Sequence, residues 1–313
     1  MRKRALGKTD LQVSELSLGT WGLSGDAYGP VVEAEADRVI DRALAVGITL
    51  FDTADVYGRG DMERRLGKRL HGADATYVVT KIGTDLETSP PRKRFDPASL
   101  WTAFERSQER LARDVVDGVL LHNPPIQALR SSEPTAFLKD LKKQGKIRFW
   151  GVSAGSADVA RSAIREEADV IELAYNVLLP SDLHEVAGDV SEGGAGVLAR
   201  SVLAHGLLAG QWSAEREFYP GDHRAERWTP GELRTRIRQL DALRPLVSGP
   251  VVSLRAAALR FVLTNQLVST AVLGPRSVNQ LDQLVREAGM PPYLRDTALA
   301  ELSTRLKKFG VGV

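Results

Sequence analysis

The chain has 313 residues, 43% of them hydrophobic and 26% charged, with a net charge of +2 and no cysteine. This ordinary composition with interspersed charges predicts no nucleic-acid partner, and the lack of cysteine excludes disulfides, thiolate metal ligands and a thiol nucleophile. No apolar run approaches the roughly 20 residues of a membrane span, and the N-terminus has no apolar signal segment, so we expect a cytoplasmic protein.

Strand-like and helix-like runs alternate along the chain. Residues 15–20 form the first candidate strand, and residues 33–47 follow it with apolar residues at helical spacing. Seven further strand–helix pairs follow: 49–57 with 61–72, 77–83 with 97–113, 114–122 with 134–146, 147–154 with 156–168, 169–176 with a weaker helix at 181–194, 196–203 with 252–265, and 269–275 with 277–289. Eight such units predict an α/β fold, a single (β/α)8 TIM barrel domain over residues 1–313.

Three segments lie outside this repeat. Residues 2–14 contain two short segments around a GKTD turn, and we expect them to form a hairpin that plugs the bottom of the barrel. Residues 211–245, after the seventh strand, are too long for an ordinary connection and indicate a functional, irregular loop. Residues 294–310 predict an extra amphipathic helix at the C-terminus. Two short basic clusters, RKRAL and PPRKRF, are interpreted as solvated loops.

An open, doubly wound sheet shows the same alternation and is the competing architecture. Its GxGxxG fingerprint is absent, because the first strand ends in GTWGLSG. GKT at residues 7–9 is similar to the tail of a phosphate-binding loop, but no strand precedes it and Arg2 stands where the first glycine is required. The barrel is therefore favoured.

Four polar residues lie at or just past the ends of three predicted strands. Asp52 ends the second strand, Lys81 the third and His122 the fourth, and Tyr57 lies five residues past Asp52. In such barrels the C-terminal strand ends form the active site. Tyrosine, with an ordinary pKa of about 10, needs a neighbouring cation to favour its phenolate. Lys81 can supply that cation, Asp52 can hold Lys81, and His122 can bind a substrate oxygen, so the set suits carbonyl reduction by hydride.

Each of these residues alone also has an ordinary structural explanation, such as a turn residue or a buried ion pair. The other histidines are interpreted as satisfied polar residues: His71, His184, His205 and His223. No two histidines have the spacing of a metal site, so no metal is expected.

The segments FDTADVYG, VVTKIG, LLHNPP and GKIRFWGVS together resemble the aldo-keto reductases, and the similarity runs through essentially the whole chain. The resemblance implies NADPH- or NADH-dependent interconversion of alcohols with aldehydes, ketones or sugar carbonyls. It assigns the catalytic tetrad to Asp52, Tyr57, Lys81 and His122, with Tyr57 as the general acid. The substrate is then a small molecule, and a homo-oligomer is an open possibility.

The resemblance also implies cofactor contacts, with NADPH preferred and NADH possible. Ser153 and Glu172 stand where the family holds the nicotinamide carboxamide, although Ala154 and Glu172 replace the usual asparagine and glutamine. Arg276 is the expected fork for the adenosine 2′-phosphate. The remaining expected cofactor contacts are Gly19, Thr20, Trp21, Asp52, Arg200, Ser201, Leu203, Gly274, Gln280 and Gln283.

Arg200 is a departure from the family, which commonly places an aromatic residue there. Near the nicotinamide ring, its charge would favour the neutral reduced cofactor over the cationic oxidised one; the alternative is that Arg200 pairs with a phosphate or with Glu172. The substrate pocket is expected to contain Trp21, Tyr28, Tyr57, His122 and Trp228. Phe95, Trp212 and Phe218 are expected either to join that wall or to anchor their own loops.

Two other functions are open at this stage. A nucleotide-sensing binding subunit, as in the potassium-channel β subunits, has the same fold and binds NADPH with slow turnover. A barrel isomerase or aldolase with Lys81 as a Schiff base requires Lys81 to be free of Asp52 and leaves residues 274–284 unexplained. The lack of an evident partner surface favours the reductase.

Overall fold

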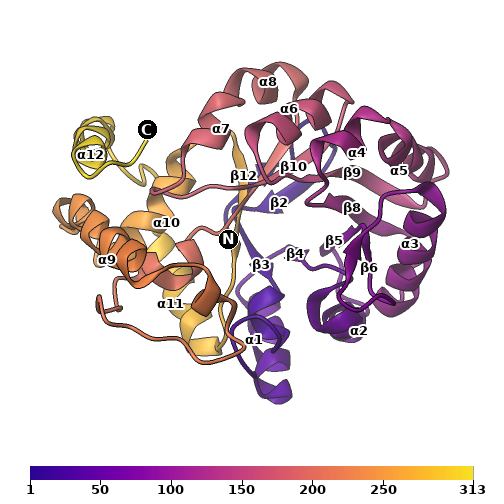
Figure 1. The fold of residues 1–313 in the computed structure, drawn as a ribbon, viewed down its shortest axis with the longest axis horizontal. Helices are drawn as coiled ribbons and strands as arrows, with labels where there is room; N and C mark the ends of the chain where they lie inside the picture. The colour runs from indigo at the N-terminus through magenta and orange to yellow at the C-terminus, as the bar shows by residue number, and fades with distance from the viewer. Residues whose placement is uncertain (313) are drawn as a thin grey trace.

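The computed structural model describes residues 1–312, and eight parallel strands close into a barrel (Figure 1). The barrel strands are β3 (Leu16–Gly19), β4 (Leu50–Asp52), β5 (Tyr77–Ile82), β8 (Val116–His122), β9 (Ile147–Ser153), β10 (Val170–Ala174), β11 (Gly196–Arg200) and β12 (Val268–Leu273). Each strand pairs with the next one in the chain, and β12 closes the barrel on β3. The predicted (β/α)8 barrel is therefore confirmed, and the open sheet is excluded.

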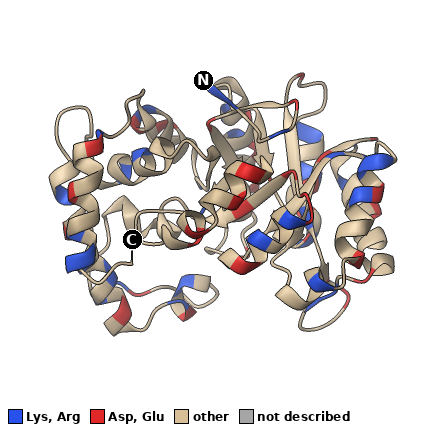
Figure 2. Cartoon of the chain, turned by 90° about the horizontal axis from the view of Figure 1, so that it is seen from above, with Lys and Arg blue, Asp and Glu red and all other residues tan. Residues whose placement is uncertain are grey.

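Helices surround the barrel and connect its strands (Figure 1). They are α1 (Glu33–Ala45), α2 (Asp61–Arg69), α3 (Pro97–Leu111), α4 (Ile126–Arg130), α5 (Glu133–Lys143), α6 (Ala157–Arg165), α7 (Ser181–Glu185), α8 (Ala187–Gly193), α10 (Leu254–Thr264) and α11 (Val278–Ala288). The weaker helix predicted at 181–194 is thus two short helices separated at Val186. Basic and acidic residues are interspersed over the helices in Figure 2. Within residues 1–312, no helix has the length and apolar character needed to cross a bilayer.

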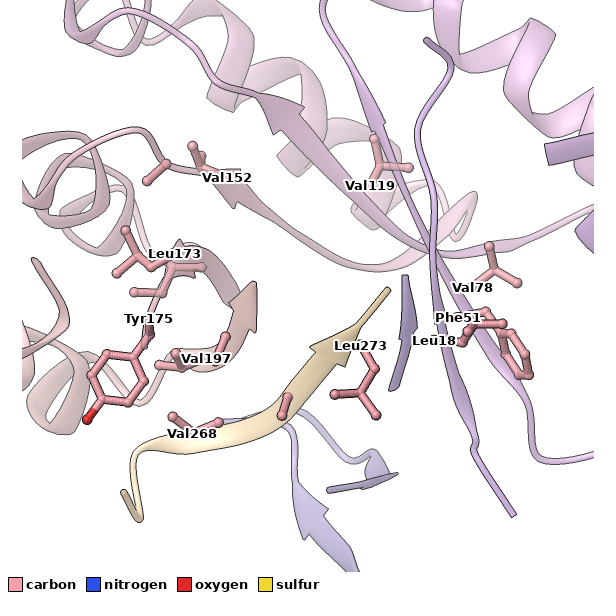
Figure 3. Close-up of a cluster of buried hydrophobic side chains, with 14 of the residues drawn as sticks. Leu18, Phe51, Val78, Val119, Val152, Leu173, Tyr175, Val197, Val268 and Leu273 are labelled. Atoms are coloured by element: carbon pink, nitrogen blue, oxygen red, sulfur yellow. The ribbon is translucent and has the colours of Figure 1, made fainter. Parts of the chain in front are cut away.

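Side-chain alternation along the strands builds two apolar layers. One set points outward against the helices (Figure 3) and includes Leu18, Phe51, Val78, Val119, Val152, Leu173, Val197 and Leu273. The other set fills the barrel interior and includes Leu50, Val79, Leu120, Phe149, Val170, Leu198 and Val272. Because successive residues point to opposite faces, the residue two positions beyond an interior residue also points inward, closer to the C-terminal mouth.

The predicted N-terminal hairpin closes the opposite end of the barrel. It consists of β1 (Lys3–Ala5) and β2 (Gln12–Ser14), which pair antiparallel. Leu6, Leu11 and Val13 pack against the interior layer. The connecting turn requires glycine at Gly7, because φ is +55° and a Cβ there would lie 2.1 Å from the Gly196 nitrogen.

The interpretation of RKRAL as a solvated loop is wrong. Arg4 donates hydrogen bonds to the carbonyls of Leu263, at 2.6 Å, and Val268, at 2.8 Å. Carbonyls at the end of a helix have no partner within the helix, so a nearby guanidinium can satisfy them. Arg4 therefore ties the hairpin to the connection between α10 and β12.

The long connection after β11 contains more regular structure than predicted. Helix α9 (Pro230–Gln239) lies inside the segment 211–245, and Thr229 and Glu232 form a capping box at its start. The predicted extra helix is α12 (Asp296–Lys308), which shares a second apolar cluster with this connection. The remaining elements are the short strands β6 (Thr84–Asp85) and β7 (Arg92–Lys93) and the 3-10 helices Trp21–Leu23, Tyr57–Gly60, Ala204–Ala209, His223–Glu226, Leu240–Ala242 and Arg244–Leu246.

Candidate active site

The polar residues at the barrel mouth point inward, two residues beyond the apolar interior layer along each strand. Asp52, Lys81 and His122 each follow an interior residue of their own strand by two positions. The same spacing from an inward position places three more polar residues at this mouth: Ser153, Glu172 and Arg200. The barrel therefore brings together side chains from six strands that are far apart in the sequence.

Lys81 is buried between two carboxylates. Its Nζ donates hydrogen bonds to Asp52 Oδ2, at 2.5 Å, and to the carbonyl of Thr53, at 3.0 Å. Glu172 Oε2 lies 3.5 Å from the same Nζ and has no hydrogen-bond partner among residues 1–312. Although burial opposes its charge, Asp52 and Glu172 raise the pKa of Lys81 above its usual value. Lys81 is therefore the single cation beside two buried carboxylates. Burial of Asp52 and the charge of Glu172 raise the pKa of Asp52.

Tyr57 lies above Lys81, in the connection between β4 and α2. Lys81 Nζ is 5.3 Å from the centroid of the Tyr57 ring, and the centroid of the His122 ring is 6.0 Å from it, edge-on. Burial raises the pKa of Tyr57, and the opposing effect of Lys81, in the direction predicted, does not outweigh it. The phenol therefore holds its proton at neutral pH and is available as a proton donor.

His122 is the neutral partner in this set. Burial holds the pKa of His122 well below its usual value, and the cations Lys81, Lys93 and Arg200 add to that effect. Its Nδ1 is buried and has no hydrogen-bond partner among the described residues. A neutral imidazole can hydrogen-bond a substrate oxygen but has no extra proton to give, which leaves Tyr57 as the acid.

A sharp turn presents Tyr57 to the mouth. Gly58, Arg59 and Gly60 have φ values of 58°, 50° and 88°, a left-handed run that two glycines make accessible. Beneath the turn, the fully buried Glu63 accepts hydrogen bonds from Arg110 Nε, at 2.6 Å, and Thr80 Oγ1, at 2.5 Å. These two hydrogen bonds hold the start of α2, and hence the turn, against α3 and β5.

Asp55 lies in the same connection, and the burial of its carboxylate predicts a measurable pH dependence of stability. It is 2% exposed, its Oδ1 has no hydrogen-bond partner among residues 1–312, and burial and the neighbouring Glu63 raise its pKa to about 7. The folded state therefore binds more protons than the unfolded state between about pH 4 and 7, so stability falls as pH rises through this range.

Asp55→Asn is expected to flatten this dependence and to raise the free energy of unfolding at pH 8 by up to roughly 4 kcal/mol. At about pH 4 the variant and the wild type should be nearly equal, because the aspartate is then protonated in the folded state. Urea unfolding at a series of pH values measures the effect, and the exposed Asp74→Asn is the control. Parallel curves for Asp55→Asn and wild type would contradict the assignment.

The mouth holds a cavity of about 1000 Å³. Most predicted cofactor and substrate residues line it: Gly19, Trp21, Tyr28, Asp52, Tyr57, His122, Ser153, Glu172, Arg200, Ser201, Leu203, Gly274, Arg276, Gln280 and Gln283. Lys81 lies beneath its floor, paired with Asp52. Such a cavity is at the upper end of the usual range for ligand sites, roughly 300–1,000 Å³.

Two predicted contacts lie away from the cavity wall. Thr20 is fully buried, and its hydroxyl donates to the carbonyl of Asp52 at 3.0 Å, so it holds β3 against β4. Trp228 packs behind the wall, with ring centroids 5.9 Å from Trp212 and 6.2 Å from His205. Its ring therefore anchors the long connection.

Three of the predicted cofactor-binding residues form hydrogen bonds within the protein: Arg276, Gln280 and Arg200. Arg276 donates from Nε to the carbonyl of Gly22, at 3.2 Å, and from Nη2 to the carbonyls of Gly29, at 2.8 Å, and Pro30, at 3.0 Å. Gln280 Oε1 accepts from the Arg276 nitrogen at 2.8 Å. Arg200 Nη2 donates to the carbonyl of Ala154 at 3.2 Å and, among residues 1–312, forms no ion pair with Glu172.

Several cavity residues were missed by the reasoning from sequence. Residues 90–94 of the cluster PPRKRF are exposed, as predicted, but Lys93 also donates from Nζ to the carbonyl of His122 at 2.7 Å and lines the cavity. His205 lines the cavity, and its Nδ1 lies 3.1 Å from the Tyr28 hydroxyl. His223 is not part of the cavity lining, but its ring packs at a tilt against Trp21, with centroids 4.6 Å apart. None of them lies on a barrel strand, so strand-end spacing gave no signal for them.

The donor set suits a nicotinamide dinucleotide better than a metal. Within residues 1–312, no group of three or more histidine, aspartate or glutamate side chains is placed to hold a metal ion. The cavity instead offers arginines for phosphates and two buried polar atoms without partners, His122 Nδ1 and Glu172 Oε2.

The model of the aldo/keto reductase family matches residues 15–292, and the chain belongs to this family of nicotinamide-dependent oxidoreductases. A pyridoxal 4-dehydrogenase from Microbacterium luteolum is 28% identical, covering 90% of this chain and 92% of its own. The NADH-specific methylglyoxal reductase of Escherichia coli K12 is 29% identical, covering 91% and 93%. The structure of a glycerol dehydrogenase from Gluconobacter oxydans is 26% identical, with a TM-score of 0.85, and the match covers 99% and 97%.

Proposed function

We propose that this protein reduces small aldehydes, ketones or sugar carbonyls to alcohols, with Tyr57 as the proton donor. One observation carries the proposal: the Tyr57 phenol lies above a buried Lys81–Asp52 pair and beside the buried His122 ring, at the floor of a large cavity. Relatives named for alcohol, sugar or aldehyde substrates support this reaction class.

Each of the active-site residues has a separate role in the proposed reaction. A bound reduced nicotinamide would supply the hydride to the carbonyl carbon. Tyr57 donates its phenolic proton to the carbonyl oxygen, and Lys81, charged because of Asp52, stabilises the phenolate that forms. His122 hydrogen-bonds the same oxygen and fixes its position relative to Tyr57. Ser153 and Glu172 are proposed to hold the carboxamide, since a carboxylate accepts from an amide NH₂.

The geometry speaks against the Schiff-base alternative. A Schiff base requires a neutral, accessible amine. Lys81 Nζ is instead hydrogen-bonded to Asp52 and Thr53, its side chain is 1% exposed, and its pKa is raised. An aldolase or isomerase that uses this lysine is therefore not supported.

The test is a screen of small aldehydes, ketones and sugars with NADPH and with NADH, in which nicotinamide absorbance is followed and the alcohol is identified. Aldehyde-dependent loss of absorbance with matching alcohol formation is the expected result. Tight cofactor binding without turnover across the screen would instead support the nucleotide-sensing alternative.

We also propose that NADPH is preferred and that Arg276 supplies the preference. Its Nη1 has no hydrogen-bond partner among residues 1–312, so part of the guanidinium is available to a 2′-phosphate. Arg276→Ala is expected to weaken NADPH binding by roughly 10- to 100-fold more than NADH binding, because a hydrogen bond to a charged group is lost.

The NADPH/NADH ratio of dissociation constants is the relevant measurement for Arg276→Ala. Loss of the bonds to Gly22, Gly29 and Pro30 loosens the loop for both cofactors and cancels in this ratio. Arg255→Ala is the control, since Arg255 lines the same cavity but its Nε is bound to Glu287 at 2.9 Å. Equal weakening of both cofactors in Arg276→Ala would show that the preference lies elsewhere.

A further inference from the structure

The cavity at the barrel mouth is strongly cationic. Its lining contains seven basic residues, Lys93, Arg200, Arg216, Arg224, Arg227, Arg255 and Arg276, and two acidic ones, Asp52 and Glu172. Both acids contact Lys81 below the floor, so they offset at most one of the wall's positive charges. Arg224 pairs with Asp222, and Arg255 pairs with Glu287. The other five basic residues have no carboxylate partner among residues 1–312.

Arg227 and Arg216 differ from the other three of these five residues, because neither guanidinium forms a hydrogen bond or an ion pair with any residue of the described chain. Lys93, Arg200 and Arg276 each donate to a backbone carbonyl. Arg216 lies over the Trp212 ring, 5.1 Å from its centroid, whereas Arg227 has no such aromatic contact among residues 1–312. An arginine that lines a cavity with all its donors free is suited to a planar or tetrahedral anion.

Packing of the neighbouring rings places Arg227 on the Tyr57 side of the cavity. The Trp21 ring lies 6.2 Å from Tyr57 and 5.3 Å from Tyr28, centroid to centroid. Trp228, the residue after Arg227, packs on His205 with ring centroids 6.2 Å apart, and His205 Nδ1 lies 3.1 Å from the Tyr28 hydroxyl. The charge of Arg227 also opposes the rise that burial causes in the pKa of Tyr28. Arg227 therefore lines the part of the cavity beside Tyr28, with the Trp21 ring between Tyr28 and the proton donor.

We propose that Arg227 selects carbonyl substrates that carry an anionic group, a carboxylate or a phosphate, at the end remote from the reacting carbonyl. The reacting oxygen would lie at Tyr57 and His122, and the anion would lie at Arg227, with Arg200 adding positive potential. This inference rests on the proposed carbonyl reduction, which places the reacting end. It names a substrate class and a specificity-determining residue in the connection after β11.

The test uses two matched pairs of aldehydes. One pair is 4-carboxybenzaldehyde and its methyl ester, and the other is glyceraldehyde 3-phosphate and glyceraldehyde. We expect wild-type kcat/KM to be higher for at least one charged member than for its neutral partner. Arg227→Gln should reduce kcat/KM for that member by roughly 10- to 100-fold and leave the neutral member unchanged. The pair that responds identifies the anion as carboxylate or phosphate.

Two variants and one binding measurement make the interpretation specific. Arg227→Lys should restore part of the preference because it keeps the charge, whereas Arg216→Gln, a cavity cation held against Trp212, should leave the preference in place. The dissociation constant of NADPH should not change in Arg227→Gln. An equal loss of NADPH affinity would show that Arg227 binds a cofactor phosphate and would overturn the proposal, as would equal kcat/KM within both wild-type pairs.

A binding arm separates this inference from the proposed function. Benzoate and benzamide are titrated against wild type and Arg227→Gln, with and without NADPH, and tryptophan fluorescence is followed because Trp21 lines the cavity. Tighter binding of benzoate than of benzamide, lost in Arg227→Gln, supports the anion site even if no aldehyde is reduced. Equal binding of the two, with aldehydes still reduced, would overturn the inference and leave carbonyl reduction standing.

Discussion

Tyr57→Phe is expected to reduce the rate of carbonyl reduction by about 10² to 10⁴-fold, the usual effect of losing a positioned acid. The phenol is the protonated group above Lys81, and the neighbouring imidazole of His122 is neutral, so no second donor stands at this position. The Tyr57 hydroxyl has no hydrogen-bond partner among residues 1–312, so its removal should change the folded structure little. Cofactor dissociation constants should therefore stay close to those of the wild type.

Tyr28→Phe is the matched control for Tyr57→Phe. It removes a hydroxyl from the same aromatic wall, one that lies 3.1 Å from His205 Nδ1, but one that is not next to Lys81. We expect a much smaller effect on kcat there. Single-turnover reduction with saturating cofactor separates the chemical step from binding. A near wild-type rate in Tyr57→Phe would refute the assigned acid.

The fold and three of the central four residues were predictable because they depend on local periodicity, whereas Tyr57 lies in a loop and was assigned from its position after Asp52 and from the family resemblance. A buried parallel strand has alternating inward and outward side chains, so Leu50 and Asp52, or Val79 and Lys81, must share a face once the strand is recognised. The barrel then brings all strand ends to one mouth. No long-range contact had to be known to place Asp52, Lys81 and His122 together.

The loop contributions could not be predicted in the same way. The contact of Lys93 with the His122 carbonyl, and the place of Arg227 in the segment that packs beside Tyr28, depend on how long connections pack, and their side chains follow no fixed period. Trp228, which packs on Trp212 and does not line the cavity, shows the same limit, since a loop aromatic is as suited to anchoring as to lining a pocket. One signal was present: Thr229, Pro230 and Glu232 have the spacing of a capping box and mark the start of α9.

Glu172 adds a second carboxylate beside Lys81 at the floor of the cavity. As a buried carboxylate 3.5 Å from Lys81 Nζ, it makes a set of one cation and two acids in a place shielded from water. Such a set depends on its cation, because each uncompensated buried charge is destabilising. Lys81 is therefore expected to serve stability as well as catalysis.

Lys81→Met is expected to lower the free energy of unfolding by about 3–5 kcal/mol at neutral pH, as is usual when one member of a buried ion pair is removed. Carbonyl reduction should also fall, since the phenolate of Tyr57 loses its stabilising cation. The matched variant is the double replacement Lys81→Met with Glu172→Gln, which removes one of the two acids left without a cation. It should be more stable at neutral pH than Lys81→Met alone.

The pH dependence gives Lys81→Met its sharpest test. In the wild type, burial and Glu172 already raise the pKa of Asp52 to about 7, and Lys81 opposes that rise. Without the cation the folded-state pKa of Asp52 should rise further, so the folded variant binds more protons than the folded wild type near and above pH 7, and its stability deficit relative to wild type grows as pH rises from about 6 to 9. Urea unfolding across this range measures the deficit. A deficit that does not change with pH, or no gain from Glu172→Gln, would mean that loss of packing, rather than unpaired charge, destabilises the variant.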